Sequence, residues 1–335
     1  MLDYDPHYGL KSSRVTALPV GFFKIEMRVT TMYELLTDFQ NHLNDQDLSP
    51  LTIKGYLSDL HHFARWFEQT NGEALSVQRI TPTDVKEYKH FLLVVERRKA
   101  GTVNRRLAAL TALCKWARQT KQITSDPTEN IKGVTGVARG PKWLDKHEQH
   151  RLLRAIENDL ELAQQKYPKR WLTRRRDASL VLFLLHTGLR LSEAVELRME
   201  DIQLSERKGS VLVQHGKGNK QRSVPLNSDA RKALQEWLKV RPQSDYLWMT
   251  VEGEHDVLSG RTVQRILQRY AREAQLDELT PHVCRHTFAK NLVENEVGLE
   301  KVAALLGHSS LNTTRIYITP SERDLELAVE HLITQ

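Results

Sequence analysis

The stretch from Thr280 to Thr319 reads TPHVCRHTFAKNLVENEVGLEKVAALLGHSSLNTTRIYIT, and it holds a histidine–arginine pair, a later histidine and a tyrosine. Pro281 is expected to open a helix, because its fixed φ suits the first helical position. His282 and Arg285 are three residues apart, so both would lie on one face of that helix. We therefore expect a compact helical unit that brings polar side chains together.

A second apolar run, from Val302 to Leu306, ends at Gly307, a residue that commonly closes a helix. His308 follows directly, and Tyr317 comes nine residues later. A tyrosine has a pKa of about 10, so only roughly one molecule in a thousand carries the attacking phenolate at pH 7. Arginine offers a planar fork for phosphate oxygens, and histidine moves protons near neutral pH. The group therefore indicates a tyrosine that attacks phosphodiesters.

Each member of this group also has a structural explanation. A histidine beside a helix commonly caps or packs, and a tyrosine at a helix end is commonly an amphipathic anchor. His282 and His286 are four residues apart, a spacing that zinc sites use, with Cys284 between them. However, the HExxH glutamate is missing and the cysteine would point to another face, so we expect no metal site. Only the joint occurrence of the polar groups favours chemistry.

Three motifs, HVCR at 282–285, LLGH at 305–308 and Tyr317, resemble the C-terminal signature of the tyrosine recombinases, also called the phage integrase family. The resemblance implies a further arginine and a lysine upstream. TGLRLSE at 187–193 is similar to the first arginine motif of that family. There Glu193 is expected to orient Arg190, with a purely structural ion pair as the alternative.

The upstream lysine is sought in GSVLVQHGKGNKQRSVPL at 209–226, where the period changes from helical to alternating. Val211 and Val213 would share one side, and a turn at 216–220 predicts a β-hairpin. In the family a lysine on this hairpin protonates the leaving oxygen. Lys217 matches that position and Lys220 is the alternative, whereas a solvated turn lysine is the structural explanation for either.

Length and composition agree with a chain of about two domains. The 335 residues are 40% hydrophobic and 27% charged, without an apolar run near 18 residues or a signal-peptide pattern, so we expect a soluble protein. The two cysteines, Cys114 and Cys284, favour reduced thiols in the cytoplasm. A net charge of +7 suits a polyanionic partner without requiring one.

The N-terminal part, residues 31–120, shows a helical apolar period with helix starts at Ser49-Pro50, Thr81-Pro82 and Gly101-Thr102. These signals predict a small four-helix bundle, which resembles the SAM-like core-binding domain of the family. Residues 1–30 are expected to form a tail of unknown role, in which Val20–Met27 is either a short strand or an ordered segment. Because 30 residues are too few for a further domain, the chain is similar to the simple two-domain Xer-type recombinases.

Residues 121–142 are rich in glycine, proline and basic side chains and predict an interdomain linker. The second domain, residues 143–335, is expected to be α+β, so the whole chain is mainly α with a small hairpin or sheet. In it, 166–176 is a basic run interpreted as a solvated loop, Asp177 is expected to cap an apolar helix, and 321–333 predicts a terminal helix that packs in its own subunit or on a neighbour.

Basic side chains on both domains are candidates for contact with a DNA backbone, although a solvated face explains any single one equally well. They are Lys54, Arg65, Lys99, Arg105 and Arg106 in the bundle, and Arg174, Arg175 and Arg265 in the second domain.

The resemblance implies a cofactor-independent and metal-independent site-specific recombinase of the bacterial cytoplasm, associated with the nucleoid. It would cut and rejoin double-stranded DNA through a 3′-phosphotyrosyl intermediate, with four subunits on two sites. The implied catalytic set is Arg190, Lys217, His282, Arg285, His308 and Tyr317. A telomere resolvase or type IB topoisomerase shares this chemistry, and a non-catalytic DNA-binding protein is the third alternative. The target sequence, the biological role and any accessory protein cannot be read from these residues.

Overall fold

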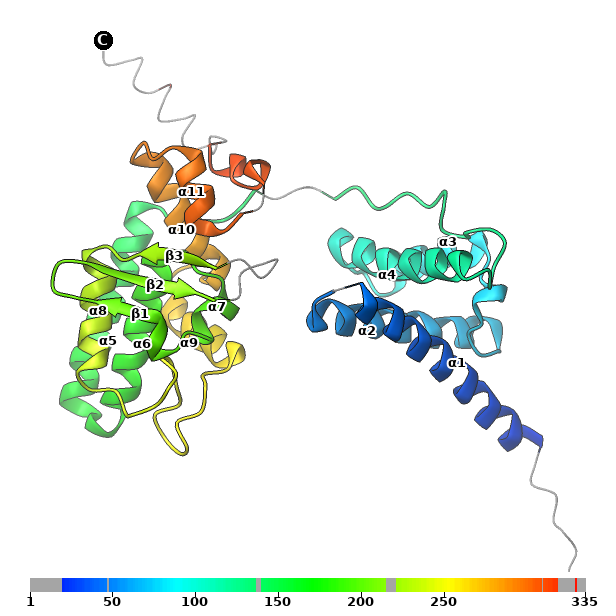
Figure 1. The fold of residues 1–335 in the computed structure, drawn as a ribbon, viewed down its shortest axis with the longest axis horizontal. Coiled ribbons are helices and arrows are strands. Elements are labelled where there is room, and N and C mark those ends of the chain that lie inside the picture. The colour runs from blue at the N-terminus through cyan, green and yellow to red at the C-terminus, as the bar shows by residue number, and fades with distance from the viewer. Residues whose placement is uncertain are drawn as a thin grey trace, which may run out of the picture. The chain divides into compact units, whose positions relative to one another are not determined.

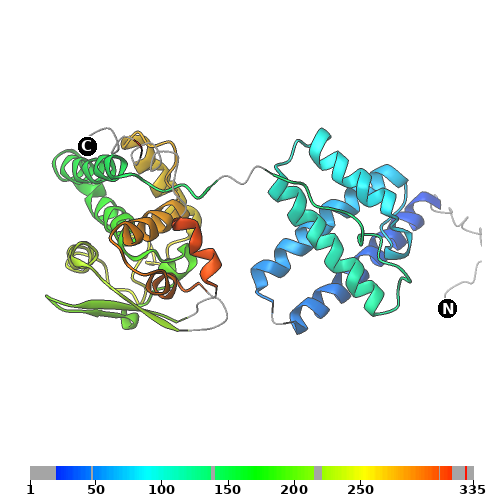
Figure 2. The same ribbon diagram turned by 90° about the horizontal axis from the view of Figure 1, so that it is seen from above.

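The computed structural model describes residues 20–46, 48–136, 140–214, 221–308, 310–318 and 329 (Figures 1 and 2). The chain divides into two compact units, Met1–Ala138 and Arg139–Gln335, each with its own hydrophobic core. Both are mainly helical and the second carries one small sheet, which confirms the predicted fold class. No helix in the described ranges is long and apolar enough to span a membrane.

The N-terminal unit contains α1 (Val20–Asp45), α2 (Pro50–Asn71), α3 (Pro82–His90) and α4 (Ala100–Gln119), with a 3₁₀ turn at Val77–Arg79 and a π-helical turn at Phe91–Val95. Ser49 and Thr81 cap α2 and α3 as predicted, because each side-chain oxygen accepts a backbone N–H three residues later. The expectation of a strand or tail over Val20–Met27 was wrong. Residues 22–46 contain no proline or glycine that would break a helix. Helix α1 therefore extends N-terminally beyond residue 31, where the helical apolar period was expected to begin.

Part of the predicted linker, residues 130–136, packs on the N-terminal unit. Asn104 of α4 clamps it by donating from Nδ2 to Val134 O (3.0 Å) and accepting from Val134 N at Oδ1 (2.7 Å). Glycine permits this close approach, because a Cβ on Gly133 would lie 3.0 Å from Asn104 Oδ1 and one on Gly136 would lie 2.9 Å from Ala100 Cβ. Gly133 and Gly136, which suggested a free linker, therefore allow this segment to pack closely against α4.

We expect Asn104→Ala to destabilise the N-terminal unit by about 1 to 3 kcal/mol, because it leaves a partly buried backbone N–H and C=O without their partner. Urea unfolding followed by circular dichroism measures the change. Asn130→Ala, an exposed asparagine in the same segment, is the control and should move the free energy of unfolding by less than about 0.5 kcal/mol. Equal effects of the two variants would show that the clamp contributes nothing.

In the C-terminal unit a sheet of order β1-β2-β3 lies along one side of the helices, as Figure 2 shows. The strands β1 (Ile202–Leu204), β2 (Gly209–Val213) and β3 (Arg222–Pro225) pair antiparallel, and Val211 opposite Val224 is fully buried. The predicted hairpin is thus confirmed, while the three-residue β1 was not foreseen. The helices are α5 (Lys146–Lys166), α6 (Pro168–Thr187), α7 (Leu191–Val195), α8 (Ser228–Leu238), α9 (Gly260–Glu273), α10 (Pro281–Glu294) and α11 (Leu299–Leu306), with 3₁₀ turns at Met199–Asp201, Leu311–Thr313 and Arg315–Tyr317.

Helix α6 corrects two expectations about the basic run at 166–176. The run is mostly helical, because Pro168 opens α6 well before the apolar residues begin. Asp177 is not a cap but a buried residue within the helix, where it accepts hydrogen bonds from Arg176 (2.6 Å) and Arg269 (3.1 Å). Arginines that looked solvated in the sequence instead neutralise buried carboxylates of their own unit.

Candidate active site

Three arginines from distant parts of the chain meet at the C-terminal end of α11. Arg222 Nε donates to Leu305 O (3.1 Å), Arg285 Nη2 to Leu306 O (2.7 Å), and Arg190 Nη2 to Gly307 O (3.0 Å). The last carbonyls of a helix lack partners within it and carry the negative end of its dipole. The helix end therefore holds three guanidinium groups together in one place.

Glu193, in the first turn of α7, is shared by two of these arginines. Its carboxylate accepts from Arg190 Nη1 (2.8 Å) and from Arg222 Nη2 (2.7 Å), and its side chain is only 3% exposed. Burial by itself would raise the pKa of Glu193, but the hydrogen bonds from Arg222 and Arg190 lower it to about 2. The contact between Glu193 and Arg190 that the resemblance implied is present.

The sequence interpretation missed Arg222. Its position on the strand could have revealed it, since side chains alternate along β3 and Arg222 lies on the same face as the buried Val224. An arginine at an inward position of a strand needs an anionic partner, and Glu193 supplies it.

Arg285, on α10, is almost completely buried. Its other contact is from Nη1 to Gly188 O (2.8 Å), just after α6. Burial, with the positive charge of Arg190, lowers the pKa of Arg285 to about 10, so it stays protonated at neutral pH. Gly188 has φ +62°, and a Cβ there would lie 2.4 Å from Phe288 Cδ1, which explains the glycine of the TGLRLSE motif.

Tyr317 lies in a 3₁₀ turn and is 1% exposed, packed with Ala289, Val302 and Leu306. Its Oη is 2.8 Å from His286 Nδ1, and the two ring centroids are 5.6 Å apart. Burial raises the pKa of Tyr317, and the charge of Arg285 opposes that change. The phenol of Tyr317 is therefore neutral at pH 7, and it is hydrogen-bonded to His286.

The partner of the tyrosine is His286, whereas the catalytic set implied by the resemblance contains His282. His282 is exposed, and its ring centroid lies 6.4 Å from that of His286. The sequence interpretation considered His286 only as a zinc ligand. Its place one turn after His282 and next to Arg285 was the available signal.

His308 follows the cap residue Gly307, whose φ of +66° confirms the predicted helix end. His308 Nδ1 is 2.9 Å from Thr314 Oγ1. Burial, together with the charges of Arg285 and Arg190, lowers the pKa of His308 to about 4. The imidazole is thus neutral at pH 7 and can act through hydrogen bonds.

The two candidate lysines, Lys217 and Lys220, lie outside the described residues, as does the predicted terminal helix at 321–333 apart from residue 329. The strands on either side of 215–220 are described, and β3 begins with Arg222 beside the other site residues. Within the described part of the chain, no group of three or more His, Cys, Asp or Glu side chains is arranged to hold a metal ion.

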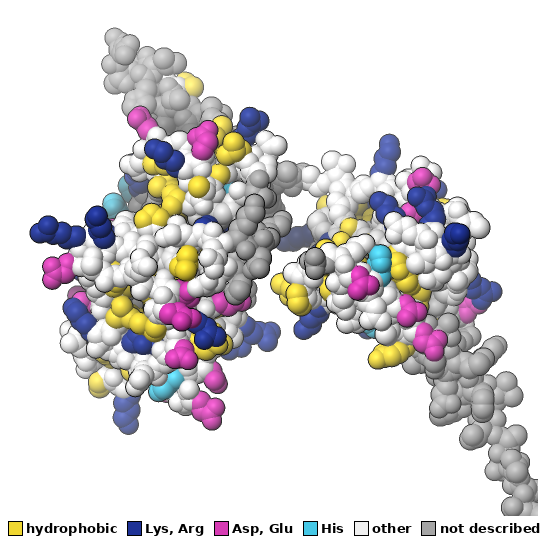
Figure 3. Space-filling view, in the orientation of Figure 1, with side chains coloured by type: hydrophobic (Ala, Val, Ile, Leu, Met, Phe, Trp, Pro, Cys, Tyr) yellow, Lys and Arg dark blue, Asp and Glu magenta, His cyan; other side chains and the backbone are white. Residues whose placement is uncertain are grey.

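Some of the basic side chains predicted to contact phosphate are exposed, whereas others already contact acidic or aromatic side chains of the protein. Figure 3 shows lysine and arginine side chains spread over the visible face of both units. Lys54, Arg65, Lys99 and Arg265 are exposed, and Arg105 is exposed but bonded to Asp59. Arg175 lies over the Trp171 ring (5.6 Å) and Arg174 is 3.6 Å from Asp159.

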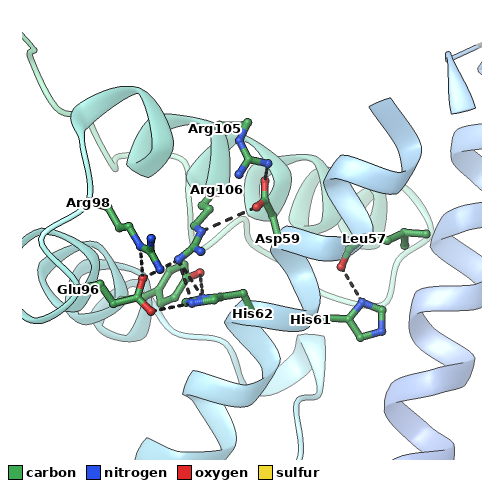
Figure 4. A network of polar contacts seen from close by, with 9 residues as sticks. Leu57, Asp59, His61, His62, Glu96, Arg98, Arg105 and Arg106 are labelled. Atoms are coloured by element: carbon green, nitrogen blue, oxygen red, sulfur yellow. Dashed lines mark hydrogen bonds and ion pairs between the residues drawn. The ribbon is translucent and has the colours of Figure 1, made fainter. Parts of the chain in front are cut away.

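Arg106 is better explained as a structural residue than as a phosphate contact. Its side chain is 10% exposed, and Nη1 donates to Glu96 Oε2 (2.9 Å) in the network that joins α2 and α4 (Figure 4). His62 approaches the other oxygen of Glu96 at 2.8 Å, and Asp59 lies 3.8 Å from Arg106 Nε. The charge of Arg106 is therefore already balanced inside the unit.

Comparison with known proteins identifies the family. Residues 142–323 match the phage integrase family, and residues 36–121 match the phage integrase N-terminal SAM-like domain. The chain belongs to the phage integrase family. This membership confirms the recognition of a tyrosine recombinase from the HVCR, LLGH and TGLRLSE motifs.

Relatives within the phage integrase family match over most of their length. The tyrosine recombinase XerC of Corynebacterium glutamicum is 31% identical over 88% of this chain and 90% of its own. The tyrosine recombinase XerA of Thermococcus kodakarensis is 31% identical over 89% of this chain and 93% of its own. A crystal structure of the XerH site-specific recombinase bound to palindromic difH, in a post-cleavage complex, superimposes with a TM-score of 0.67 at 26% identity, covering 83% and 79% of the two chains.

Proposed function

We propose that this phage integrase family member cuts and rejoins double-stranded DNA at a specific site, with Tyr317 as the nucleophile that forms a 3′-phosphotyrosyl link. The observation that carries the proposal is the meeting of three arginines at the end of α11, next to the turn that bears Tyr317. Fixed positive donors stabilise the charge that develops when an oxygen attacks a phosphate. The names of the relatives, site-specific and tyrosine recombinases, support the same reaction.

Arg190 and Arg285 would bind the two non-bridging oxygens of the scissile phosphate. Each guanidinium has five N–H donors, and the contacts to Glu193, Gly188 and the α11 carbonyls occupy only some of them. The Arg190 side chain is 28% exposed, so its remaining donors can reach a ligand. Because the helix end fixes both groups in advance, little reorganisation is needed when the phosphate arrives.

Two further side chains would act on the same phosphate. His308, neutral and 2.9 Å from Thr314, would donate a hydrogen bond to an oxygen. Lys217, with Lys220 as the alternative, would protonate the 5′-oxygen as it leaves, and His282 would relay protons at the edge of the site. Each step exchanges one phosphodiester for another, so the bond energy is conserved.

Strand exchange would follow when a 5′-hydroxyl from a partner duplex attacks the phosphotyrosyl link and restores Tyr317. Four copies of the chain on two sites would exchange strands in pairs. The exposed Lys54, Arg65 and Lys99 of the N-terminal unit and Arg265 of the second unit would bind the DNA backbone without reading its sequence. Such a protein would work in the bacterial cytoplasm at the nucleoid.

A nicked suicide duplex tests the function directly. Sites would first be selected from a random duplex pool by binding to the full chain, and a nick near the cleavage position would let the short 5′-product diffuse away. We expect an adduct that survives denaturant and disappears on proteolysis, with the nucleotide attached at Tyr317. Absence of any adduct on a site that the protein binds tightly would refute the proposal.

The products distinguish the alternatives that share this chemistry. Two-site substrates should yield joined recombinant DNA. Relaxation of supercoiled DNA without joined products would indicate a topoisomerase, and hairpin ends would indicate a telomere resolvase. Binding without adduct would leave only a DNA-binding protein.

The glycine at the end of α11 provides a further prediction. A Cβ on Gly307 would lie 2.9 Å from Arg222 Cζ, so Gly307→Ala should displace the arginines and lower the single-turnover cleavage rate by about 10²-fold or more. Left-handed backbone alone costs alanine roughly 1 to 2 kcal/mol. Gly253→Ala is the control, because Gly253 has φ +82° but open space around its Cβ. Similar cleavage by both variants would show that the arginine contacts at Gly307 are dispensable.

A further inference from the structure

The contact between Tyr317 and His286 has the geometry of a proton transfer. The Tyr317 Oη lies 2.8 Å from His286 Nδ1, within ordinary hydrogen-bonding distance. The tyrosine is 1% exposed and belongs to a buried apolar cluster with Ala289, Val302 and Leu306. An imidazole this close to a shielded phenol is well placed to receive its proton, which bulk water is not.

We propose that His286 is the group that receives the phenolic proton of Tyr317 during attack, and that a bound phosphate makes this transfer possible. The proposal rests on the proposed function, because it assigns a role within the same reaction. It gives His286 the task of proton acceptor and leaves the exposed His282 at the edge of the site.

The charges around His286 explain why phosphate is required. On its own helix His286 is faced by His282 and Arg285, the Arg315–Tyr317 turn brings Tyr317 against it, and His308 lies within electrostatic reach after α11. Burial, followed by the influence of His282 and Arg285, lowers the pKa of His286 to about 4. A phosphate on Arg285 would offset that positive charge and raise the basicity of His286.

The same charges would hold the proton on Tyr317 when no phosphate is bound. Burial raises the pKa of Tyr317 while that of His286 is lowered, so without DNA the proton stays on the phenol. Once the phosphate is bound, the O–H bond of Tyr317 breaks as its oxygen bonds to phosphorus, and the proton passes to His286 Nδ1. The bond from phosphorus to the 5′-oxygen breaks, and that oxygen takes a proton from the general acid of the proposed function, Lys217 or Lys220. Rejoining reverses each transfer.

His286→Gln provides the first test, because glutamine can hydrogen-bond the phenol but cannot accept its proton. On the nicked suicide duplex we expect single-turnover cleavage to fall about 10²- to 10⁴-fold, the usual contribution of a general base, with DNA affinity unchanged. A wild-type rate, or a faster one, would overturn the proposal, and a faster one would mean that His286 only holds the tyrosine back.

Two signatures separate proton transfer from a structural role. Free imidazole should restore cleavage by His286→Ala, and more basic imidazoles should do so better at equal concentration of free base. In His286→Gln, 3-fluorotyrosine at position 317 should recover part of the lost rate, because its phenol gives up the proton more easily. A slow variant that responds to neither treatment would refute the role of proton acceptor.

The matched control is His186→Gln. His186, near the end of α6, is also partly buried, and its Nδ1 lies 3.1 Å from Asn227 Nδ2. Burial lowers its pKa as well, so the substitution tests loss of a partly buried histidine in the same unit. We expect cleavage within about twofold of the wild type and no response to imidazole. Loss of cleavage equal to that of His286→Gln would count against the proposal.

Nitrogen NMR of the wild-type chain gives a test that needs no variant to fold. A proton acceptor must carry its lone pair on Nδ1 and its proton on Nε2, and ¹⁵N-histidine shifts distinguish the two tautomers. A protonated Nδ1 on His286 would overturn the proposal even if every substitution unfolded the unit. Because the wild-type adduct tests the reaction separately, failure of the His286 role and failure of the proposed function give different results.

Discussion

The Tyr317→Phe variant is expected to lose DNA cleavage by on the order of 10⁶-fold, the scale of loss when an enzyme's nucleophile is removed. Phenylalanine keeps the ring that packs with Ala289, Val302 and Leu306 and removes only Oη. The stability change should therefore be limited to one hydrogen bond with His286, about 1 kcal/mol. Adduct yield on the suicide duplex and thermal unfolding measure the two effects separately.

A matched substitution isolates the hydroxyl of Tyr317 from the general loss of a buried hydroxyl. Tyr270→Phe, in α9, removes a phenol oxygen that donates to Asp159 (2.9 Å) in the same unit. Both variants should fold and bind DNA with wild-type affinity, and Tyr270→Phe should still form adduct. If Tyr317→Phe formed adduct as well, the nucleophile would be another residue and the proposed reaction would have to be reassigned.

Short-range signals in the sequence predicted much of the fold because local chemistry decides those features. A serine directly before a proline is a common helix start, and Ser49 before Pro50 caps α2. A glycine after an apolar run commonly ends a helix, and Gly307 ends α11 with positive φ. The alternating valines of 209–226 likewise specify a hairpin, since one face must be buried. These signals depend on a few neighbouring residues and need no knowledge of the rest of the chain.

Long-range pairing limited the remaining predictions. The basic run at 166–176 looked solvated because the carboxylate that pairs with its Arg174, Asp159, lies on another helix. Arg269, on a third helix, lies near the same carboxylate. The motif residues Arg190 and Arg285 were recognised, but their anchors are backbone carbonyls, which every residue possesses and no sequence pattern marks. His286 was considered only as a zinc ligand, because only the folded chain brings Tyr317, 31 residues away, against it.

We expect Glu193→Ala to destabilise the C-terminal unit by about 3 to 5 kcal/mol, because it leaves Arg190 and Arg222 without the carboxylate that neutralises both. Cleavage should fall together with stability, since Arg190 loses the contact that orients it. Urea unfolding and single-turnover cleavage measure the two effects. Glu196→Ala, an exposed carboxylate three residues along, should change neither by more than a small amount.

The charge of Glu193 also predicts how stability depends on pH. Its pKa is about 2 in the folded chain and about 4.5 ordinarily, so it contributes stability above about pH 4.5 and loses it as the pH falls toward 2. The full contribution is about 3 kcal/mol, because each tenfold change in the proton affinity of the carboxylate corresponds to about 1.4 kcal/mol. Glu96 in the other unit has a similarly lowered pKa, so the difference between the wild type and Glu193→Gln must be compared at each pH. That difference should shrink between pH 5 and pH 2, and a constant difference would mean that the carboxylate contributes through its shape and not its charge.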